Sequence, residues 1–321
     1  MRRLAARAHF WGGLLTGPLV VVLGLSGAAL VFRAELDEAL GGPPAVTASG
    51  PVRALDAIAA AALLTEPGGE ARALHVPARR DRPYRVEVVR GARRVDVAVD
   101  PVTLRVVDSR VPERSVLMAV HSLHAAFHAG APGAIAVGVL GLALVAESVT
   151  GLWLYGPSLR RRARGVRPRG SSRGLHRLVG GLTLALSLVV GVTGVALALA
   201  GSVAIAALPP AAGGLARLDT LASRALAVVP GGTLASLVAV DGRHVRAEAR
   251  RGGEHVVVLL ERETGSVVAV PPPSSGGAWD LVRRLHTGDF AGWLSRLAYA
   301  LTGLALPALA ITGYLTATRP R

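Results

Sequence analysis

The sequence predicts a membrane α-helical protein: a four-transmembrane-helix bundle with two small α+β extracytoplasmic modules, built as a parallel internal repeat. Three observations lead to this prediction. Of the 321 residues, 51% are hydrophobic, and the mean hydropathy is +0.46. The apolar residues gather in four long runs. One histidine and one Ser/Thr-Gly pair recur at matched spacing with these runs, which indicates a duplicated unit.

Each apolar run approaches the roughly 20 residues that a membrane-spanning helix needs. The first run has no charged residue. It is too long for the core of a cleavable signal peptide, and no small-residue cleavage site precedes Arg33. Glu147 is the one acidic residue within the second run. The four runs cover residues 10–32, 131–155, 178–208 and 297–318.

The distribution of arginine predicts the orientation in the membrane. All 36 basic residues are arginine, and the formal net charge is +15. Acid-free arginine clusters lie before the first run, between the second and third runs, and at the end of the chain, whereas the two other connecting segments are nearly balanced in charge. The positive-inside rule therefore places both termini and the central Arg-rich loop in the cytoplasm, as expected for a multi-pass protein of the bacterial inner (cytoplasmic) membrane. No aromatic platform accompanies the loop, so we expect no nucleic-acid partner.

These signals divide the chain into seven segments. They are a first helix (1–34), a first module (35–115), a second helix with a preceding interfacial helix (116–157), the cytoplasmic Arg-rich loop (158–174), a third helix (175–205), a second module (206–280) and a fourth helix (281–321).

Each module is expected to begin with a short helix, at 53–64 and at 218–228. Alternating apolar residues then predict strands at 84–89 and 95–100 in the first module, and at 244–249, 256–261 and 267–270 in the second. Modules of this size lack a large core of their own, so we expect them to lean on each other or on the helices.

The absence of two residue types excludes several chemistries. The chain has no cysteine, which rules out a disulfide framework, a thiolate zinc site, an Fe–S cluster and a covalently attached c-type haem. It has no lysine, which rules out a P-loop and a Schiff-base lysine. The nine histidines are therefore the main candidates for metal ligation.

Four of these histidines recur with the Ser/Thr-Gly pairs. The glycine follows the histidine by 18 residues in two cases and by 27 in the other two. Because each half of the chain begins and ends on the same side of the membrane, the halves are predicted to be parallel repeats. The matched sets are His9 with Ser26-Gly27, His176 with Thr193-Gly194, His124 with Thr150-Gly151, and His286 with Thr312-Gly313.

These motifs resemble those of the PepSY-associated transmembrane proteins, often called iron-regulated membrane proteins. Besides the histidines and the Ser/Thr-Gly pairs, the chain has the module endings Asp-Pro-x-Thr at 100–103 and Glu-Thr-Gly at 263–265, and Leu-His at 123–124 and 285–286. The resemblance covers nearly the whole chain and implies PepSY-like modules. Some members of the family are regarded as haem-containing reductases of ferric siderophores outside the inner membrane, and others have no assigned activity.

The predicted topology sorts the four recurring histidines into two pairs. His9 and His176 enter the membrane from the cytoplasm, and His124 and His286 enter it from outside. Two imidazoles from facing helices can ligate one haem iron. The sequence therefore predicts two b-type haems, one near each face. They would pass electrons from a separate donor, either a quinol or a cytoplasmic reductase, to a periplasmic acceptor such as a ferric siderophore.

Several alternatives stay open at this point. The four histidines are also compatible with an interfacial or structural role. His121, His124 and His128 fall at i, i+3 and i+7 on one predicted helical face, so His121 or His128 is an alternative ligand for a third haem or a bound metal. The alternative function is a non-enzymatic protein whose modules bind a peptide or a periplasmic partner in a regulatory or assembly role.

Two kinds of residue within the spans also allow more than one reading. Glu147 stands where the repeat has Leu309, and it is either a proton relay or contact near the inner haem, or the partner of an arginine at the cytoplasmic end. The many glycines fit either close helix packing or contact with a flat macrocycle. The Ser/Thr hydroxyls are expected to bond back to their own helices.

Overall fold

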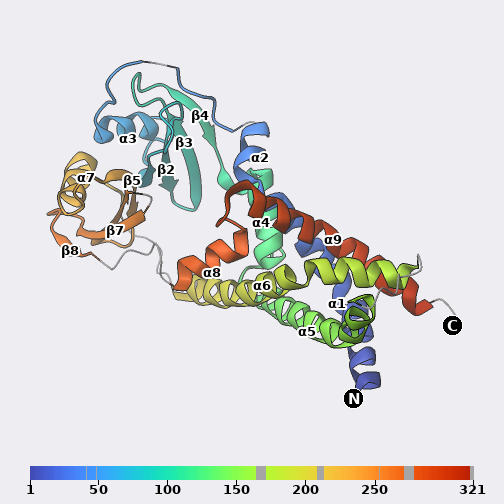
Figure 1. Ribbon diagram of the computed structural model, residues 1–321. Coiled ribbons are helices and arrows are strands. Elements are labelled where there is room, and N and C mark those ends of the chain that lie inside the picture. Colours follow the sequence, from blue (N-terminus) through green and yellow to red (C-terminus); the bar gives the residue numbers. More distant parts are fainter. Residues whose placement is uncertain are drawn as a thin grey trace. The chain divides into compact units, whose positions relative to one another are not determined.

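The computed structural model describes two compact units, which Figure 1 shows in one ribbon. The helical unit comprises Met1–Ala34, Ala119–Ala207 and Leu281–Arg321, and the sheet unit comprises Glu35–Met118 and Leu208–Asp280. The described residues are 1–40, 42–47, 49–163, 171–207, 213–252, 254–270 and 278–318. Part of the predicted Arg-rich loop, including Arg164, Arg167 and Arg169, lies outside these residues, as do Arg319 and Arg321.

Four helices of the helical unit are long and apolar enough to cross a membrane. They are α1 (Arg2–Val31), α5 (Gly130–Ala163), α6 (Ser172–Ala207) and α9 (Gly292–Thr318). Three shorter helices adjoin them in the sequence: α2 (Arg33–Ala39), α4 (Val116–Ala126) and α8 (Ala278–Thr287). The structure divides the predicted fourth helix, 281–321, between α8 and α9. Gly130 and Gly292, with φ of 59° and 61°, begin α5 and α9 in a backbone conformation that glycine adopts without strain.

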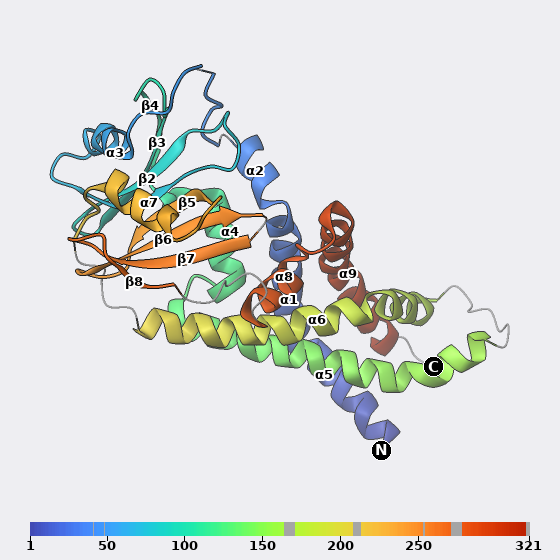
Figure 2. The same ribbon diagram turned by 60° about the vertical axis from the view of Figure 1, so that its left-hand side comes forward.

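The four long helices pack as a closed ring in the order α1, α5, α6, α9 and back to α1. Two of these helix–helix contacts, α5 with α6 and α1 with α9, are made at glycine pairs. Small residues let two helix backbones approach closely. A Cβ at Gly141 would lie 3.2 Å from the carbonyl oxygen of Gly191, where α5 meets α6 side by side (Figure 2). A Cβ at Gly24 would lie 2.9 Å from the carbonyl oxygen of Gly303, where α1 meets α9.

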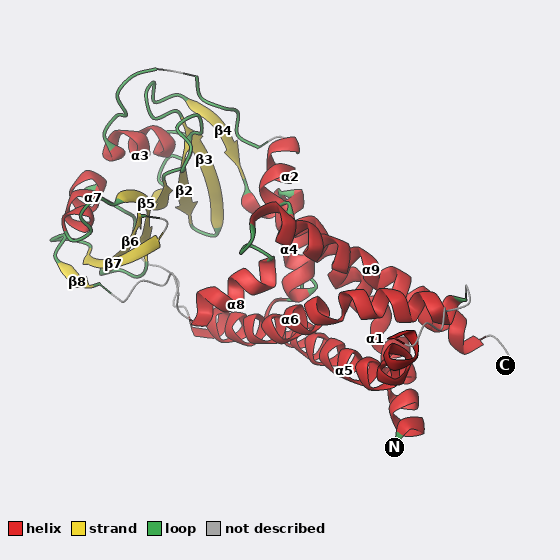
Figure 3. Cartoon of the chain, viewed as in Figure 1, coloured by secondary structure: helices red, strands yellow, loops and turns green. Residues whose placement is uncertain are grey.

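The sheet unit is one antiparallel sheet of eight strands in the order β4-β3-β2-β1-β5-β6-β7-β8. Figure 3 draws its strands in yellow. On each side of the central β1–β5 pair, the strands follow one another outward in chain order, β1 to β4 on one side and β5 to β8 on the other. The first half contains α3 (Leu55–Leu63), β1 (Glu70–His75), β2 (Tyr84–Arg90), β3 (Arg93–Val99), β4 (Val106–Arg110) and the 3-10 helix η1 (Pro112–Arg114). The second half contains α7 (Leu218–Ala227), β5 (Thr233–Ala239), β6 (His244–Arg251), β7 (Glu254–Glu261) and β8 (Val267–Ala269).

The two predicted modules are therefore joined into a single sheet, and β1, β4 and β5 are strands that the residue pattern did not predict. The central strands are hard to recognise because each contains a register irregularity, between Ala71 and Ala73 in β1 and between Leu234 and Ser236 in β5. A bulge adds a residue and so interrupts the alternation of buried and exposed side chains.

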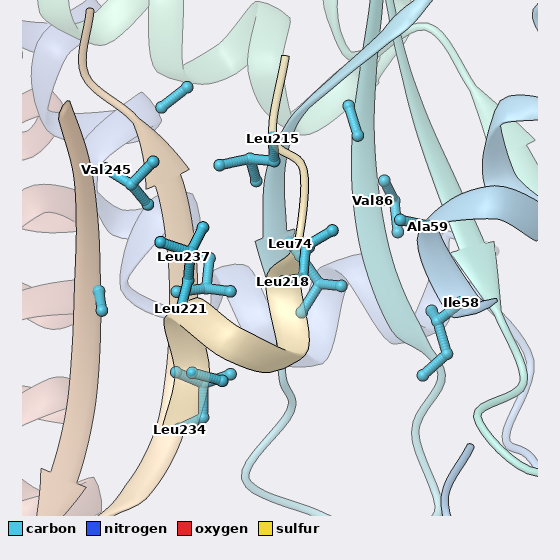
Figure 4. Packing of buried hydrophobic residues seen from close by; sticks show 14 of the residues in the cluster. Ile58, Ala59, Leu74, Val86, Leu215, Leu218, Leu221, Leu234, Leu237 and Val245 are labelled. Carbon is cyan, nitrogen blue, oxygen red and sulfur yellow. The ribbon is translucent and has the colours of Figure 1, made fainter. Parts of the chain in front are cut away.

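The core of the sheet unit lies between the sheet and its two helices (Figure 4). Ile58 of α3 and Leu221 of α7 are almost fully buried, as are Leu74 and Leu237 of the central strands. Both predicted modules thus contribute to one cluster. This sharing explains how two sequences of modest size obtain a sizeable core.

Candidate functional site

The four recurring histidines form two pairs within the helical unit. We call His9 with His176 the His9 pair, and His124 with His286 the His124 pair. In each pair the two ring centroids lie 6.1 Å apart. The ring planes meet at 81° in the His9 pair and at 49° in the His124 pair. Since α1 and α6 are opposite members of the helix ring, the rings of the His9 pair approach one another across the bundle.

Each ring also contacts the Ser/Thr-Gly pair of a neighbouring long helix. The two residues are far apart in sequence, between 93 and 141 positions. Nδ1 lies 3.0 Å from Thr150 Oγ1 for His9, 3.2 Å from Thr312 Oγ1 for His176, 3.1 Å from Ser26 Oγ for His124 and 3.1 Å from Thr193 Oγ1 for His286.

These hydrogen bonds fix the tautomer of the rings. As expected from the sequence, each hydroxyl donates to its own helix, for example Ser26 Oγ to the carbonyl oxygen of Val22 at 2.7 Å. The hydroxyl proton is thereby used, so the hydroxyl can only accept from the histidine. Nδ1 of His124 also lies 3.0 Å from the carbonyl oxygen of Leu23, and a carbonyl is only an acceptor. The proton therefore lies on Nδ1, and the lone pair of Nε2 is available to a metal.

Two of the other rings also have a main-chain partner. His176 Nδ1 lies 3.0 Å from the carbonyl oxygen of Leu309, and His286 makes a backbone hydrogen bond with Val190. Leu23, Val190 and Leu309 each stand three residues before the Ser/Thr that contacts the same ring. These carbonyls are not among the contacts predicted from the sequence, although the constant spacing of the Ser/Thr-Gly pairs contained the signal.

The glycine of each pair lies against the imidazole ring. A Cβ at Gly27 would lie 2.9 Å from Cε1 of His124, and one at Gly194 would lie 3.1 Å from Cε1 of His286. At Gly151 and Gly313 the corresponding distance, to His9 and His176, is 3.3 Å. These four glycines therefore make room for the histidine rings, whereas Gly24, Gly141, Gly191 and Gly303 serve helix packing.

Glu147 makes the environment of His9 different from that of the other three histidines. Its carboxylate oxygen Oε2 lies 2.8 Å from His9 Nδ1, where the other rings have a main-chain carbonyl. Contact with His9 is an interaction that neither predicted role of Glu147 named.

Both pairs fit a haem iron with two axial histidines. Two imidazoles bound through Nε2 to one metal, each by a bond of about 2 Å, have ring centroids roughly 6 Å apart. In the described part of the chain, no three His, Asp or Glu side chains gather as a possible metal site. A pair of histidines suits a group that brings its remaining four donors in its own macrocycle.

The structure separates His121 and His128 from the two pairs. His121 is on α4 with His124, and its side chain is exposed. The predicted common helical face does not extend to His128, because α4 ends at Ala126 and both Phe127 and His128 have positive φ, 46° and 61°. Neither residue joins either ring pair.

The remaining histidines that the sequence left aside lie in the sheet unit. His244 contacts Asp241 at 3.0 Å, and His255 contacts Glu248. His75 lies on the central strand β1. Burial, together with the positive charge of Arg85, lowers the pKa of His75 from 6.5 to about 4.

Among known protein families, the model of the PepSY-associated TM region matches the chain over residues 6–319. No curated protein matches the chain. The family model spans the four long helices and the sheet unit together, in agreement with the resemblance noted from the motifs. The chain therefore belongs to the PepSY-associated TM region family of membrane proteins.

Proposed function

We propose that this membrane protein holds two b-type haems, one on each histidine pair, and transfers electrons across the bacterial inner membrane. The observation that carries the proposal is the geometry of the pairs. Each has a ring separation of 6.1 Å and hydrogen bonds at Nδ1 that leave Nε2 to a metal. The matched contacts in the two halves of the chain also support the proposed parallel internal repeat.

The depths of the two pairs suit transfer across a bilayer. His9 is near the start of α1, and Ser26, which contacts His124, is near its end. At 1.5 Å per residue the two positions are about 25 Å apart along the helix. The hydrocarbon layer is about 30 Å thick. With both termini in the cytoplasm, the His9 pair lies toward the cytoplasm and the His124 pair toward the periplasm.

The protein residues hold and tune the group. When bound, haem supplies one-electron redox chemistry. Each axial histidine is oriented by a Ser/Thr hydroxyl and by a second Nδ1 acceptor, and such partners raise the basicity of the ligand. The chain has no cysteine to tether a haem, so retention depends on the two histidines and on the packing around them.

The proposed acceptor is a ferric siderophore in the periplasm, and the proposed donor is a quinol or a separate cytoplasmic reductase. Reduction to Fe(II) weakens coordination by hard oxygen ligands and so releases the metal. This part of the proposal is supported by the family, some members of which are regarded as reductases of ferric siderophores, and by the predicted orientation in the membrane.

The test is the absorption spectrum of full-length protein purified from haem-sufficient cells. We expect a Soret band, a reducible α-band and two haems per chain. His286→Ala should remove one haem and leave the other, whereas His128→Ala, a substitution of an exposed histidine outside both pairs, should leave both. A colourless preparation would exclude the proposal. Loss of haem from His128→Ala or His121→Ala would instead move the ligand assignment to those residues.

A second function is suggested by the edge of the sheet. β8 is the last strand of the order, and its residues Val267 and Val268 are exposed. An edge strand offers backbone groups to which an extended peptide can pair. In this alternative the protein binds a peptide or a periplasmic partner in a regulatory or assembly role and has no enzymatic activity. A colourless but folded preparation would favour it.

A further inference from the structure

The two histidine pairs differ in the charge that surrounds their ligands. Three of the four rings have a neutral main-chain partner in addition to a hydroxyl: Leu23 for His124, Leu309 for His176 and Val190 for His286. At His9 this second partner is the carboxylate of Glu147, 2.8 Å from Nδ1. Among the described ring contacts of the four histidines, this is the only side-chain carboxyl group.

The two halves of the chain differ at two residues that contact each other, Glu147 and Gly12. Glu147 and Leu309 occupy matched positions, each three residues before the Thr-Gly pair. Gly12 and Val179 are also matched, each three residues after its histidine. A Cβ at Gly12 would overlap Oε1 of Glu147. The first half thus has an acid in place of leucine and, facing it, a glycine in place of valine, which gives that acid the room it needs.

Apart from this exchange, the side chains of Glu147 and Leu309 occupy equivalent positions in the two halves, as the contact with the next glycine shows. A Cβ at Gly13 would lie 3.6 Å from Glu147 Oε2, and one at the matched Gly180 would lie 3.5 Å from Leu309 Cδ2. Glu147 therefore occupies the place of an apolar side chain, with only 20% of its side chain exposed. Carboxylates are costly in membrane segments, and their presence usually reflects a function.

A carboxylate that accepts a hydrogen bond from a metal-bound histidine makes the imidazole a stronger donor. Stronger donation stabilises the oxidised metal more than the reduced metal, because the oxidised metal has the higher charge. The reduction potential of the site falls as a result. A main-chain carbonyl, which is neutral, has a smaller effect.

We propose that Glu147 is a positioning residue that lowers the reduction potential of the His9 pair below that of the His124 pair, and so favours electron flow outward. This inference rests on the proposed function. It adds the direction: with haem bound at both pairs, an electron supplied by the quinol or reductase would pass downhill from the group held by the His9 pair to the group held by the His124 pair, and then to the ferric chelate. No atom and no proton moves in that step.

The experiment is a potentiometric titration of the haem-loaded full-length protein, followed by absorbance and EPR. His286→Ala, which keeps only the His9 pair, assigns the two waves. Glu147→Gln keeps the size of the side chain and removes the charge, and Glu147→Leu installs the residue of the matched position. Both are expected to shift the His9-pair potential upward and to leave the other wave in place.

A mirror variant provides the opposite test. Val179→Gly with Leu309→Glu builds the same acid and glycine beside His176, so we expect the His9-pair potential to shift further downward. Thr183→Val, in α6 but outside both pairs, is the control and should shift neither wave.

Three results would overturn the inference: no shift in Glu147→Gln, equal shifts of both waves, or loss of haem from both Glu147 variants without a shift. The last would show that Glu147 retains the group and does not tune it. If the wild-type protein contains no haem, the proposed function itself fails, so the two failures are distinguishable.

Discussion

Asp56 and Asp219 cap each other's helices. Asp56 is in the first turn of α3, and its Oδ1 accepts the backbone N–H of Leu218 at 2.7 Å. Asp219 is in the first turn of α7, and its Oδ1 accepts the backbone N–H of Leu55 at 2.9 Å. The N-cap residues themselves, Ala54 and Arg217, make no side-chain cap. Each half of the sheet unit therefore supplies the side-chain cap for the N-terminus of the helix in the other half.

This exchange predicts that either aspartate stabilises the whole sheet unit. Asp56→Ala or Asp219→Ala leaves the N-terminal N–H groups of the opposite helix without their carboxylate, which typically costs about 1–2 kcal/mol. The measurement is the urea midpoint of the sheet unit, monitored in full-length protein by hydrogen exchange of α3 and α7. Glu254→Ala removes only an exposed contact at 4.0 Å and is the control. If α3 and α7 were independent, each substitution would loosen one helix only.

If haem binds as proposed, substitution of the glycines that contact the histidine rings should cause a graded loss of haem. Gly27→Ala places a methyl group 2.9 Å from Cε1 of His124 and should displace the ring, so that haem is lost from the His124 pair. Gly194→Ala, at 3.1 Å, should act more weakly, and Gly151→Ala, at 3.3 Å, more weakly still. Haem per chain, measured by absorbance, checks the order.

Gly17→Ala is the matched control in α1, because no atom lies within 4 Å of a Cβ built there. Alanine is the better helix former, so this variant should keep both haems and be neutral or slightly more stable. A similar loss of haem from Gly17→Ala and Gly27→Ala would contradict the role of close contact.

Removal of a hydroxyl acceptor is predicted to weaken the retention of haem. Thr193→Val preserves the shape of the side chain and removes the acceptor of His286 Nδ1–H. Loss of such an orienting partner typically weakens metal binding by about 10–100-fold. Transfer of haem to an acceptor protein should therefore become faster from the His124 pair and stay unchanged at the His9 pair. Thr302→Val, which removes a hydroxyl bonded to the Ala298 carbonyl of its own helix, should behave as wild type.

The lowered pKa of His75 predicts acid sensitivity of the sheet unit. Its pKa is about 4 in the folded protein and about 6.5 when exposed, so the unfolded chain binds the proton more readily. The stability of the sheet is therefore complete above about pH 6.5 and falls as the pH drops toward 4, by on the order of 3 kcal/mol. His75→Gln should flatten this dependence. Hydrogen exchange of β1 and β5, compared between wild type and variant at each pH, measures it; parallel pH dependences would refute the prediction.

Much of the architecture can be predicted from local features of the sequence. Four apolar runs predict four helices able to cross a membrane, and the structure has them, because helix length and hydropathy are properties of a continuous segment. The family could be recognised from the histidines and the Ser/Thr-Gly pairs, since their spacing is also written along the chain. The strands with regular alternation, such as β3 and β6, were likewise predictable.

Other features depend on contacts between distant segments. The residue pattern predicted two modules, but β1 and β5 join them into one sheet, and the bulges in these strands hide the alternation that would have revealed them. His128 falls outside α4 because the backbone turns left-handed at Phe127, which a count of helical positions cannot foresee.

The sequence by itself determined the composition of the site: four histidines, their matched Ser/Thr-Gly pairs and a single acid within the second apolar run. Only the tertiary structure decided which helix each ring contacts, and therefore which nitrogen carries the proton. It also brought Glu147 to His9, on a different helix. The physical reason is that hydrogen bonds and ring contacts depend on distance in space, and the packing of α1, α5, α6 and α9 sets that distance for residues that lie far apart in the chain.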